Sequence, residues 1–269
     1  MFRALIGRSG AFALTGVLTL TCALLVAPAT GAATGIVTRI RHAVAHLAGS
    51  SHGSQAFNGV AAVGALFTSS SGKLGSHFCT ASVVHSPAGD LALTAAHCVT
   101  GVSGTVVFVP GYHDGKAPYG IWRVTHVYTD EAWNSSQDPD DDFAFLSVVD
   151  ATQGVPVEDI TGAEQLGKSH TTRTYVQVIG YPDGASEPVQ CANWSTVFSP
   201  TQLEFDCGGY TDGTSGGPFL TDVATATGQG IVVGVIGGYE QGGDTPSVSY
   251  SSAFGSHVQA LYQTAITAG

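Results

Sequence analysis

Charged residues are scarce in this chain, and basic residues are the scarcest. Only 11% of the 269 residues are charged, and only nine are Lys or Arg. Four of these nine lie before Phe57, so the rest of the chain has five basic residues against all twenty acidic ones. Nucleic-acid binding requires clustered Lys and Arg. The composition therefore argues against a nucleic-acid partner and suits an acidic exported protein.

The sequence also lacks the cysteine spacing of metal sites. Its five cysteines include no Cys-x-x-Cys pair, so we expect no metal. No internal repeat of solenoid period is present. Glycine is abundant, with 36 residues, and Val, Thr, Ser and Ala are frequent. This composition favours short strands joined by tight turns over amphipathic helices.

The N-terminal residues have the order of a secretory signal peptide. Arg3 and Arg8 precede an apolar run over residues 11–29, and small residues follow, which is the expected order of basic, apolar and cleavage regions. We predict a signal peptide over residues 1–29, secretion to the extracellular space and no stable membrane association after cleavage. Because the run is nearly long enough to span a bilayer, an uncleaved anchor is the alternative.

Residues 30–56 contain Arg and His but no strand pattern of their own. We interpret them as a pro-segment or flexible leader, the alternative being a disordered N-terminus of the mature protein.

Strand-like apolar runs begin at Val60, separated by clusters of Gly, Pro, Asp and Asn that are typical of turns. Six runs cover residues 60–67, 78–85, 91–94, 105–109, 121–128 and 143–149, and six more cover 172–180, 189–198, 203–207, 218–221, 231–236 and 246–250. This spacing predicts an all-β chain with two small antiparallel barrels, residues 57–155 and 156–269. Apolar residues from Phe254 to Ile266 recur on one helical face, which predicts a C-terminal α-helix.

A Gly-Thr-Ser-Gly-Gly-Pro segment over residues 213–218 contains the strongest candidate for a nucleophile. Glycines let Ser215 occupy a sharp turn, with its hydroxyl exposed and backbone N–H groups beside it. A serine hydroxyl needs a neighbouring base to attack a carbonyl group. The same pattern fits the nucleophile elbow of α/β-hydrolases, whose acid and histidine follow the serine. Here only His257 follows Ser215, and it lies in the predicted helix.

His97 is the candidate base. It lies in the segment Leu-Thr-Ala-Ala-His-Cys-Val over residues 93–99, whereas the nine other histidines have no such context. The base needs a carboxylate to fix its tautomer. Asp142 is preferred over the other acids of the run (Asp138, Asp140 and Asp141), because a buried strand follows it directly and would carry its carboxylate towards His97.

These three segments, in the order His, Asp, Ser, resemble those of the chymotrypsin-like (trypsin-like) serine proteases of the bacterial secreted type. The resemblance extends from about Val60 to the C-terminus. It implies two six-stranded Greek-key β-barrels with the active site between them and the helix docked on the second barrel. It also implies a serine endopeptidase that acts on protein or peptide substrates through His97, Asp142 and Ser215, without a cofactor. The N–H groups of Gly213 and Ser215 would form the oxyanion hole.

Four cysteines remain if the N-terminal apolar stretch that holds Cys22 is removed. An even number in an exported chain indicates two disulfides, and free buried thiols are the alternative. The family resemblance implies the pairs Cys79–Cys98 and Cys191–Cys207, which also join sequence neighbours.

Two positions depart from the trypsin pattern. Thr214 stands where trypsin-type members have an aspartate that pairs with a new N-terminus, so activation by that ion pair is not expected. Gly209 stands where they have an acid at the floor of the specificity pocket, so cleavage after Lys or Arg is not expected, and compensation by Asp206 or Asp212 is the alternative. With Gly237, Gly238 and Tyr239 as the opposite wall, the pocket would favour a sizeable apolar or uncharged side chain. We expect a monomeric protease, and the alternative is a catalytically silent protein-binding module with this fold.

Overall fold

The computed structural model describes residues 52–150 and 154–268. The predicted signal peptide and most of the predicted leader lie outside the described residues. Within the described ranges, no helix has both the length and the apolar character needed to cross a membrane.

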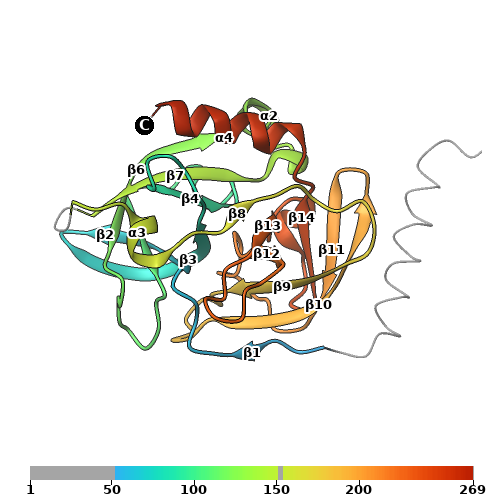
Figure 1. The fold of residues 1–269 in the computed structure, drawn as a ribbon, viewed down its shortest axis with the longest axis horizontal. Helices are drawn as coiled ribbons and strands as arrows, with labels where there is room; N and C mark the ends of the chain where they lie inside the picture. The colour runs from blue at the N-terminus through green and yellow to red at the C-terminus, as the bar shows by residue number, and fades with distance from the viewer. Residues whose placement is uncertain (1–51, 151–153, 269) are drawn as a thin grey trace, which may run out of the picture. The chain divides into compact units, whose positions relative to one another are not determined.

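The first half of the described chain forms a closed six-stranded barrel (Figure 1). Its strands are β2 (Val63–Ser70), β3 (Lys73–Val83), β4 (Leu91–Thr94), β5 (Thr105–Pro110), β6 (Trp122–Thr129) and β7 (Ala144–Val149). They are antiparallel, in the order β2-β3-β4-β7-β6-β5, and β5 pairs with β2 to close the barrel. All six predicted strands are present, shifted by at most five residues at their ends.

The second half forms an eight-stranded sheet. Six of its strands match the predicted set: β9 (Thr174–Gly180), β10 (Val189–Ser199), β11 (Gln202–Asp206), β12 (Pro218–Thr221), β13 (Ile231–Val235) and β14 (Val248–Ser252). Their order is β14-β11-β10-β9-β12-β13. The N–H of Val235 donates to the Ser251 hydroxyl at 3.0 Å, and that of Gly237 donates to the Tyr250 carbonyl at 3.0 Å. These bonds join the end of β13 to β14. Strands β14 and β13 are the first and last of the six strands in this order, so the six strands come together at their two edges.

Two strands were not predicted, β1 (Gln55–Ala56) and β8 (Gln165–Leu166), because a strand of two residues is too short to show a hydrophobic period. Strand β8 pairs in parallel with β13, and β1 pairs with the start of β10. Gly53 also bridges to Gly208. The last residues of the predicted leader are therefore paired with the second sheet.

The C-terminal helix α4 (Ser256–Ala268) is present as predicted, but the expectation that it docks on the second barrel is wrong. It packs on β6 and β7 of the first barrel (Figure 1). The rings of Tyr262 and Phe145 meet edge to face at 5.7 Å, and the Tyr262 hydroxyl donates to the His85 carbonyl at 2.8 Å. A helical apolar stripe shows that one face is buried, but it does not identify the surface that covers it.

Short helices occupy the connections. They are α2 (Glu131–Ser136), the 3-10 helix η1 (Pro139–Asp141), α3 (Val157–Thr161) and the 3-10 helix η2 (Tyr239–Gly242). One buried apolar cluster crosses from the first barrel to the second, and its members include Leu93, Phe145, Ile179 and Leu220. Burial of this shared apolar surface stabilises the contact between the barrels, on which the site described next depends.

Candidate active site

The acidic run between α2 and β7 is divided among different partners. Asp138 accepts the N–H of Asp140 at 3.0 Å and caps η1. Asp140 accepts from the Gln202 amide at 2.7 Å, and Asp141 pairs with Nδ1 of His257 at 2.8 Å. Asp142, at the end of η1, is the member of the run that bonds to His97.

The Asp142 carboxylate is fully buried and held by three hydrogen-bonding groups. Oδ1 accepts the backbone N–H of His97 at 2.9 Å. Oδ2 accepts the N–H of Gly238 at 2.8 Å and lies 2.7 Å from Nδ1 of His97. Because these hydrogen bonds involve both carboxylate oxygens, the Asp142 carboxylate is fixed in one orientation before any substrate binds.

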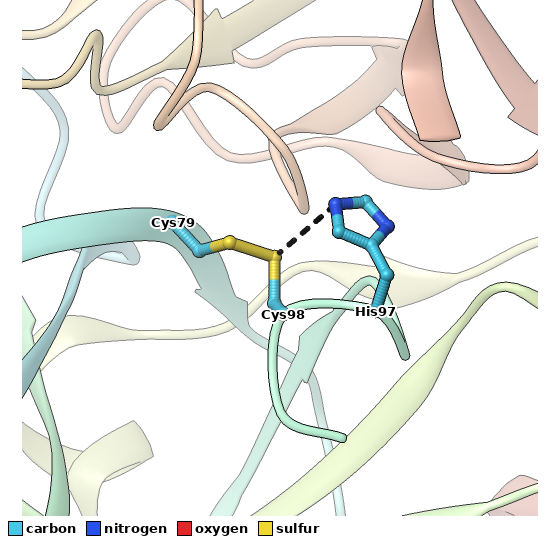
Figure 2. A group of neighbouring side chains, drawn as sticks. All are labelled: Cys79, His97 and Cys98. Carbon is cyan, nitrogen blue, oxygen red and sulfur yellow. Dashed lines mark hydrogen bonds between the residues drawn. A yellow bond between two sulfur atoms is a disulfide. The ribbon is translucent and has the colours of Figure 1, made fainter. Parts of the chain in front are cut away.

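His97 lies in the turn that follows β4, with its side chain 15% exposed. When its Nδ1–H donates to Asp142, Nε2 carries the free lone pair. Nε2 lies 3.8 Å from Sγ of Cys98 (Figure 2). Cys79 and Cys98 form the predicted disulfide, so neither sulfur is a thiolate and this trio is no metal site. The second predicted disulfide, Cys191–Cys207, is also present.

Ser215 lies in a turn that only glycine-rich sequence can form. Gly213 and Gly216 have φ values of +89° and +81°, in the left-handed region that favours glycine. A Cβ atom on Gly213 would lie 2.5 Å from the Asp183 nitrogen, and one on Gly216 would overlap the Thr80 carbonyl oxygen. The Gly-x-Ser-Gly pattern is therefore a requirement of this turn.

Ser215 and His97 line the same cavity, whose volume is about 740 Å³. Among the described residues the Ser215 hydroxyl makes no hydrogen bond, so the histidine–aspartate pair is formed while the serine–histidine bond is not. Such catalytic bonds are often long in ligand-free enzymes and shorten when substrate binds.

The direction of the two predicted oxyanion donors, the N–H groups of Gly213 and Ser215, follows from the carbonyl group of the same peptide bond. The Asp212 carbonyl accepts the N–H of Asp183 at 2.6 Å, and the Thr214 carbonyl accepts that of Gly217 at 2.9 Å. Since C=O and N–H point in opposite directions across a trans peptide, the N–H groups of Gly213 and Ser215 point away from the groups that bind these two carbonyls. Neither N–H donates to any part of the chain that the structure describes, which leaves both available to an oxyanion.

Thr80 is a residue at this site that the sequence did not single out. It is fully buried on β3, next to Cys79. Its N–H donates to the Ser215 carbonyl at 2.7 Å. Its hydroxyl donates to the Gly213 carbonyl at 3.0 Å and accepts the N–H of Tyr181 at 2.9 Å. A threonine has no sequence signal for such a role, because the partners come from the other barrel.

Thr214 is buried, and its hydroxyl donates to the Thr211 carbonyl at 2.7 Å. A Cβ on Gly180 would lie 2.8 Å from Thr214 Cβ, so the two segments are in close contact. The residue at this position therefore fills space and stabilises the turn, and it has no charge to pair with an N-terminus.

The four residues predicted to bind substrate do not line the cavity of Ser215 and His97, which is formed instead by residues 240–246 and 211–215 among others. Gly238 holds Asp142. A Cβ on Gly237 would lie 3.0 Å from Oδ2 of Asp142, and one on Gly209 would overlap the Ser54 hydroxyl. Tyr239 packs against Phe198 and Tyr250, at ring separations of 5.1 Å from each.

A second histidine near a serine does not form a comparable pair. The His170 ring lies near the backbone of Ser195, and burial lowers the pKa of His170. The Ser195 hydroxyl is fully buried in the sheet and donates to the Glu204 carbonyl at 3.0 Å. It is therefore not available as a nucleophile.

Comparison with known proteins identifies the family and the fold. The family model described as Trypsin matches residues 52–254. A search of curated proteins gives no significant match.

Among solved structures, protease Anisep from Arthrobacter nicotinovorans is 24% identical with a TM-score of 0.67, and the match covers 80% of this chain and 99% of that one. The thermostable serine protease AL20 from an extremophilic microorganism is 25% identical with a TM-score of 0.66, covering 78% and 99%. A Glu endopeptidase is 17% identical with a TM-score of 0.62, covering 81% and 98%.

Proposed function

Because the chain belongs to the trypsin family of serine proteases, we propose that it is a secreted endopeptidase with Ser215 as nucleophile, His97 as general base and acid, and Asp142 as the residue that orients His97. The observation that carries this proposal is the 2.7 Å contact between Nδ1 of His97 and Oδ2 of the buried Asp142, in which His97 lines the same cavity as Ser215. Its substrates are proteins or peptides.

In the proposed reaction, Oγ of Ser215 attacks the carbonyl carbon of a peptide bond while Nε2 of His97 takes the hydroxyl proton. The carbonyl oxygen becomes an oxyanion and accepts hydrogen bonds from the N–H groups of Gly213 and Ser215. Each such donor contributes about 3 kcal/mol in related enzymes. When the intermediate collapses, the C–N bond breaks and His97 gives its proton to the leaving amine.

The remaining acyl-enzyme is an ester on Ser215. His97 then takes a proton from water as the water oxygen attacks the ester carbonyl, and it returns the proton to Oγ of Ser215 when the acid leaves. Throughout, His97 alternates between neutral and cationic forms. The Asp142 carboxylate stabilises the cation strongly because it is fully buried and held by backbone N–H groups.

We also propose export from the cell, with residues 1–29 as signal peptide and residues 30–56 as a leader. The two disulfides support this proposal, because such bonds persist in oxidising compartments. Since Gln55 and Ala56 pair with β10, we expect cleavage within the leader, upstream of these two residues, which would stay with the mature protein.

Labelling with a fluorophosphonate probe tests the nucleophile. The full chain is expressed for secretion, purified and incubated with the probe, and the adduct is located by mass spectrometry. We expect the adduct on Ser215, its loss in Ser215→Ala, and cleavage of casein by the wild-type protein alone. Labelling without casein cleavage would support the nucleophile but contradict a general endopeptidase. A folded, secreted protein that is not labelled would overturn the proposal and favour a binding module.

A further inference from the structure

Gln202 is a buried polar side chain that bonds to two segments far from it in the chain. It begins β11 and is only 4% exposed. Its amide nitrogen donates to the Pro139 carbonyl at 3.0 Å and to Oδ1 of Asp140 at 2.7 Å. Its amide oxygen accepts the N–H of Tyr239 at 3.0 Å. Since acceptors lie on one side of the amide and a donor on the other, only one orientation of the Gln202 amide satisfies all three bonds.

The two segments that Gln202 joins are those that hold the Asp142 carboxylate. One is η1, which ends directly before Asp142. The other contains Tyr239 and the preceding Gly238, whose N–H donates to Oδ2 of Asp142 at 2.8 Å. Oδ2 is also the oxygen that lies 2.7 Å from Nδ1 of His97. Gln202 therefore fixes the backbone on both sides of the contact that orients His97.

The segment around Gly238 depends on close contact with the Gln202 amide. A Cβ atom on Gly238 would overlap Oε1 of Gln202, and Gly238 has a φ value of +79°, so this position requires glycine. Directly after Tyr239, Glu240 and Gln241 have φ values of +53° and +51°, in a region that residues other than glycine rarely adopt. Such a backbone persists only where the surrounding structure determines it. The bond from the Tyr239 N–H to Gln202 supplies such a contact at the start of the strained segment.

Gln202 does not line the cavity of Ser215 and His97, so it acts on catalysis only through the residues that it holds. Resting on the proposed function, we propose that Gln202 is a positioning residue for the reaction. Its amide holds η1 and Gly238 at the separation at which the Gly238 N–H and His97 share Oδ2 of Asp142. A glutamine of the second sheet thus orients the carboxylate that follows η1.

Gln202→Met tests the proposal, because it keeps a side chain of similar length and removes the amide. We expect kcat for a quenched peptide to fall by about tenfold to a hundredfold, since a misplacement of about 1 Å can have an effect of this size. KM should stay within about twofold, because Gln202 does not line the cavity.

Two further readouts report on the Asp142–His97 pair itself. The limb of the pH profile of kcat/KM that reflects His97 should shift in Gln202→Met. The downfield NMR signal of the His97 Nδ1–H, measured in a Ser215→Ala background, should also shift or weaken. A residue that only stabilises the fold would change neither of these two measurements.

Gln229→Met is the matched control. The Gln229 amide also donates to a distant backbone carbonyl, that of Thr161 at 3.0 Å, but this bond reaches neither η1 nor Gly238. We expect a lower Tm, with kcat, the pH limb and the NMR signal unchanged. If Gln202→Met likewise lowers only Tm, Gln202 has a structural role alone and the proposal is wrong.

Substitutions at Asp140 provide a second test that does not depend on the folding of Gln202→Met. Asp140→Ala removes one of the three bonds at a half-buried residue and should lower kcat by about threefold or more. Gln202→Glu places a second carboxylate against Asp140, and adding Asp140→Asn restores a donor–acceptor pair at this contact. We expect kcat to fall in Gln202→Glu and to recover severalfold in the double variant. An unchanged kcat in Asp140→Ala, or no recovery in the folded double variant, would contradict positioning through η1.

The rate of fluorophosphonate labelling at Ser215, measured in every variant, separates this inference from the proposed function. A labelled wild-type protein whose labelling rate is the same in Gln202→Met would contradict the role of Gln202 alone. Absence of labelling in the folded wild-type protein would contradict the proposed function and this inference with it.

Discussion

The backbone N–H of Thr80 donates a hydrogen bond to the carbonyl oxygen of Ser215 at 2.7 Å. This bond runs from β3 of the first barrel to the serine turn of the second half of the chain. The Thr80 hydroxyl adds a bond to the Gly213 carbonyl at 3.0 Å. The barrel that carries His97 and Asp142 thus also fixes the peptide groups that follow Gly213 and Ser215, the two residues whose N–H groups are the proposed oxyanion donors.

Thr80→Val should both destabilise the protein and slow its reaction. Without the hydroxyl, the Gly213 carbonyl and the Tyr181 N–H lose a buried partner, which should lower the free energy of unfolding by about 2 kcal/mol. A shifted Gly213 peptide should also slow fluorophosphonate labelling of Ser215 by about tenfold. Thr80→Ser keeps the hydroxyl and serves as control. Labelling and stability of the Val variant equal to those of the Ser variant would rule out this role.

Asp142→Asn should lower kcat/KM by about 10³- to 10⁴-fold, since an amide cannot stabilise the histidine cation and favours the wrong tautomer. The measurement is hydrolysis of a quenched peptide, with thermal unfolding to verify the fold. Asp138→Asn changes the same acidic run but keeps an oxygen that can cap η1. We expect this control to retain activity within about twofold. A similar loss of kcat/KM in both variants would contradict the assignment of Asp142 as the residue that orients His97.

Glu164 should make stability fall as pH rises. It is fully buried, and burial raises its pKa from 4.5 to about 7, although the N–H of Gly230 opposes this by donating to the carboxylate. The folded state therefore holds a proton that the unfolded state releases above about pH 4.5. The corresponding stability is fully present below that pH and is lost as pH rises through about 7.

The loss from Glu164 should amount to about 3 kcal/mol between pH 4.5 and pH 8. Urea unfolding of Ser215→Ala, which prevents self-digestion, measures it across this range. Adding Glu164→Gln should flatten the curve by that amount, whereas Glu131→Gln, which alters an exposed residue, should not. An unchanged curve in the Glu164→Gln variant would show that the carboxylate is ionised in the folded state throughout.

Replacing Cys191 and Cys207 with serine should lower the free energy of unfolding, because the unfolded chain gains conformational entropy without the disulfide. The disulfide spans 16 residues, and a loop of this length contributes about 3 kcal/mol in the chain-entropy model. For a domain of this size, that corresponds to a fall in Tm of roughly 6–12 °C. Thermal unfolding of Ser215→Ala with and without the two substitutions provides the measurement. A Tm change below about 2 °C would contradict the entropic estimate.

Local features of the fold could be predicted from the amino-acid sequence alone. Strand β4, Leu91–Thr94, matches its predicted range fully, because apolar residues bounded by turn residues carry their own signal. The glycines around Ser215 predicted a sharp turn, and the positive φ values of Gly213 and Gly216 confirm it. The two disulfides formed as the resemblance implied. Each of these features depends either on residues that are close in the chain or on a sequence motif shared with a known family.

Contacts between residues far apart in the chain are set by the tertiary structure. It paired Asp142 with His97 and gave Asp141 to His257, although the two aspartates are neighbours in one acidic run. It placed α4 on the first barrel, joined the end of the leader to β10 and brought Glu240 to the cavity of Ser215. Hydrophobic periodicity tells which face of an element is buried, but the partner of that face is set by packing of the whole domain.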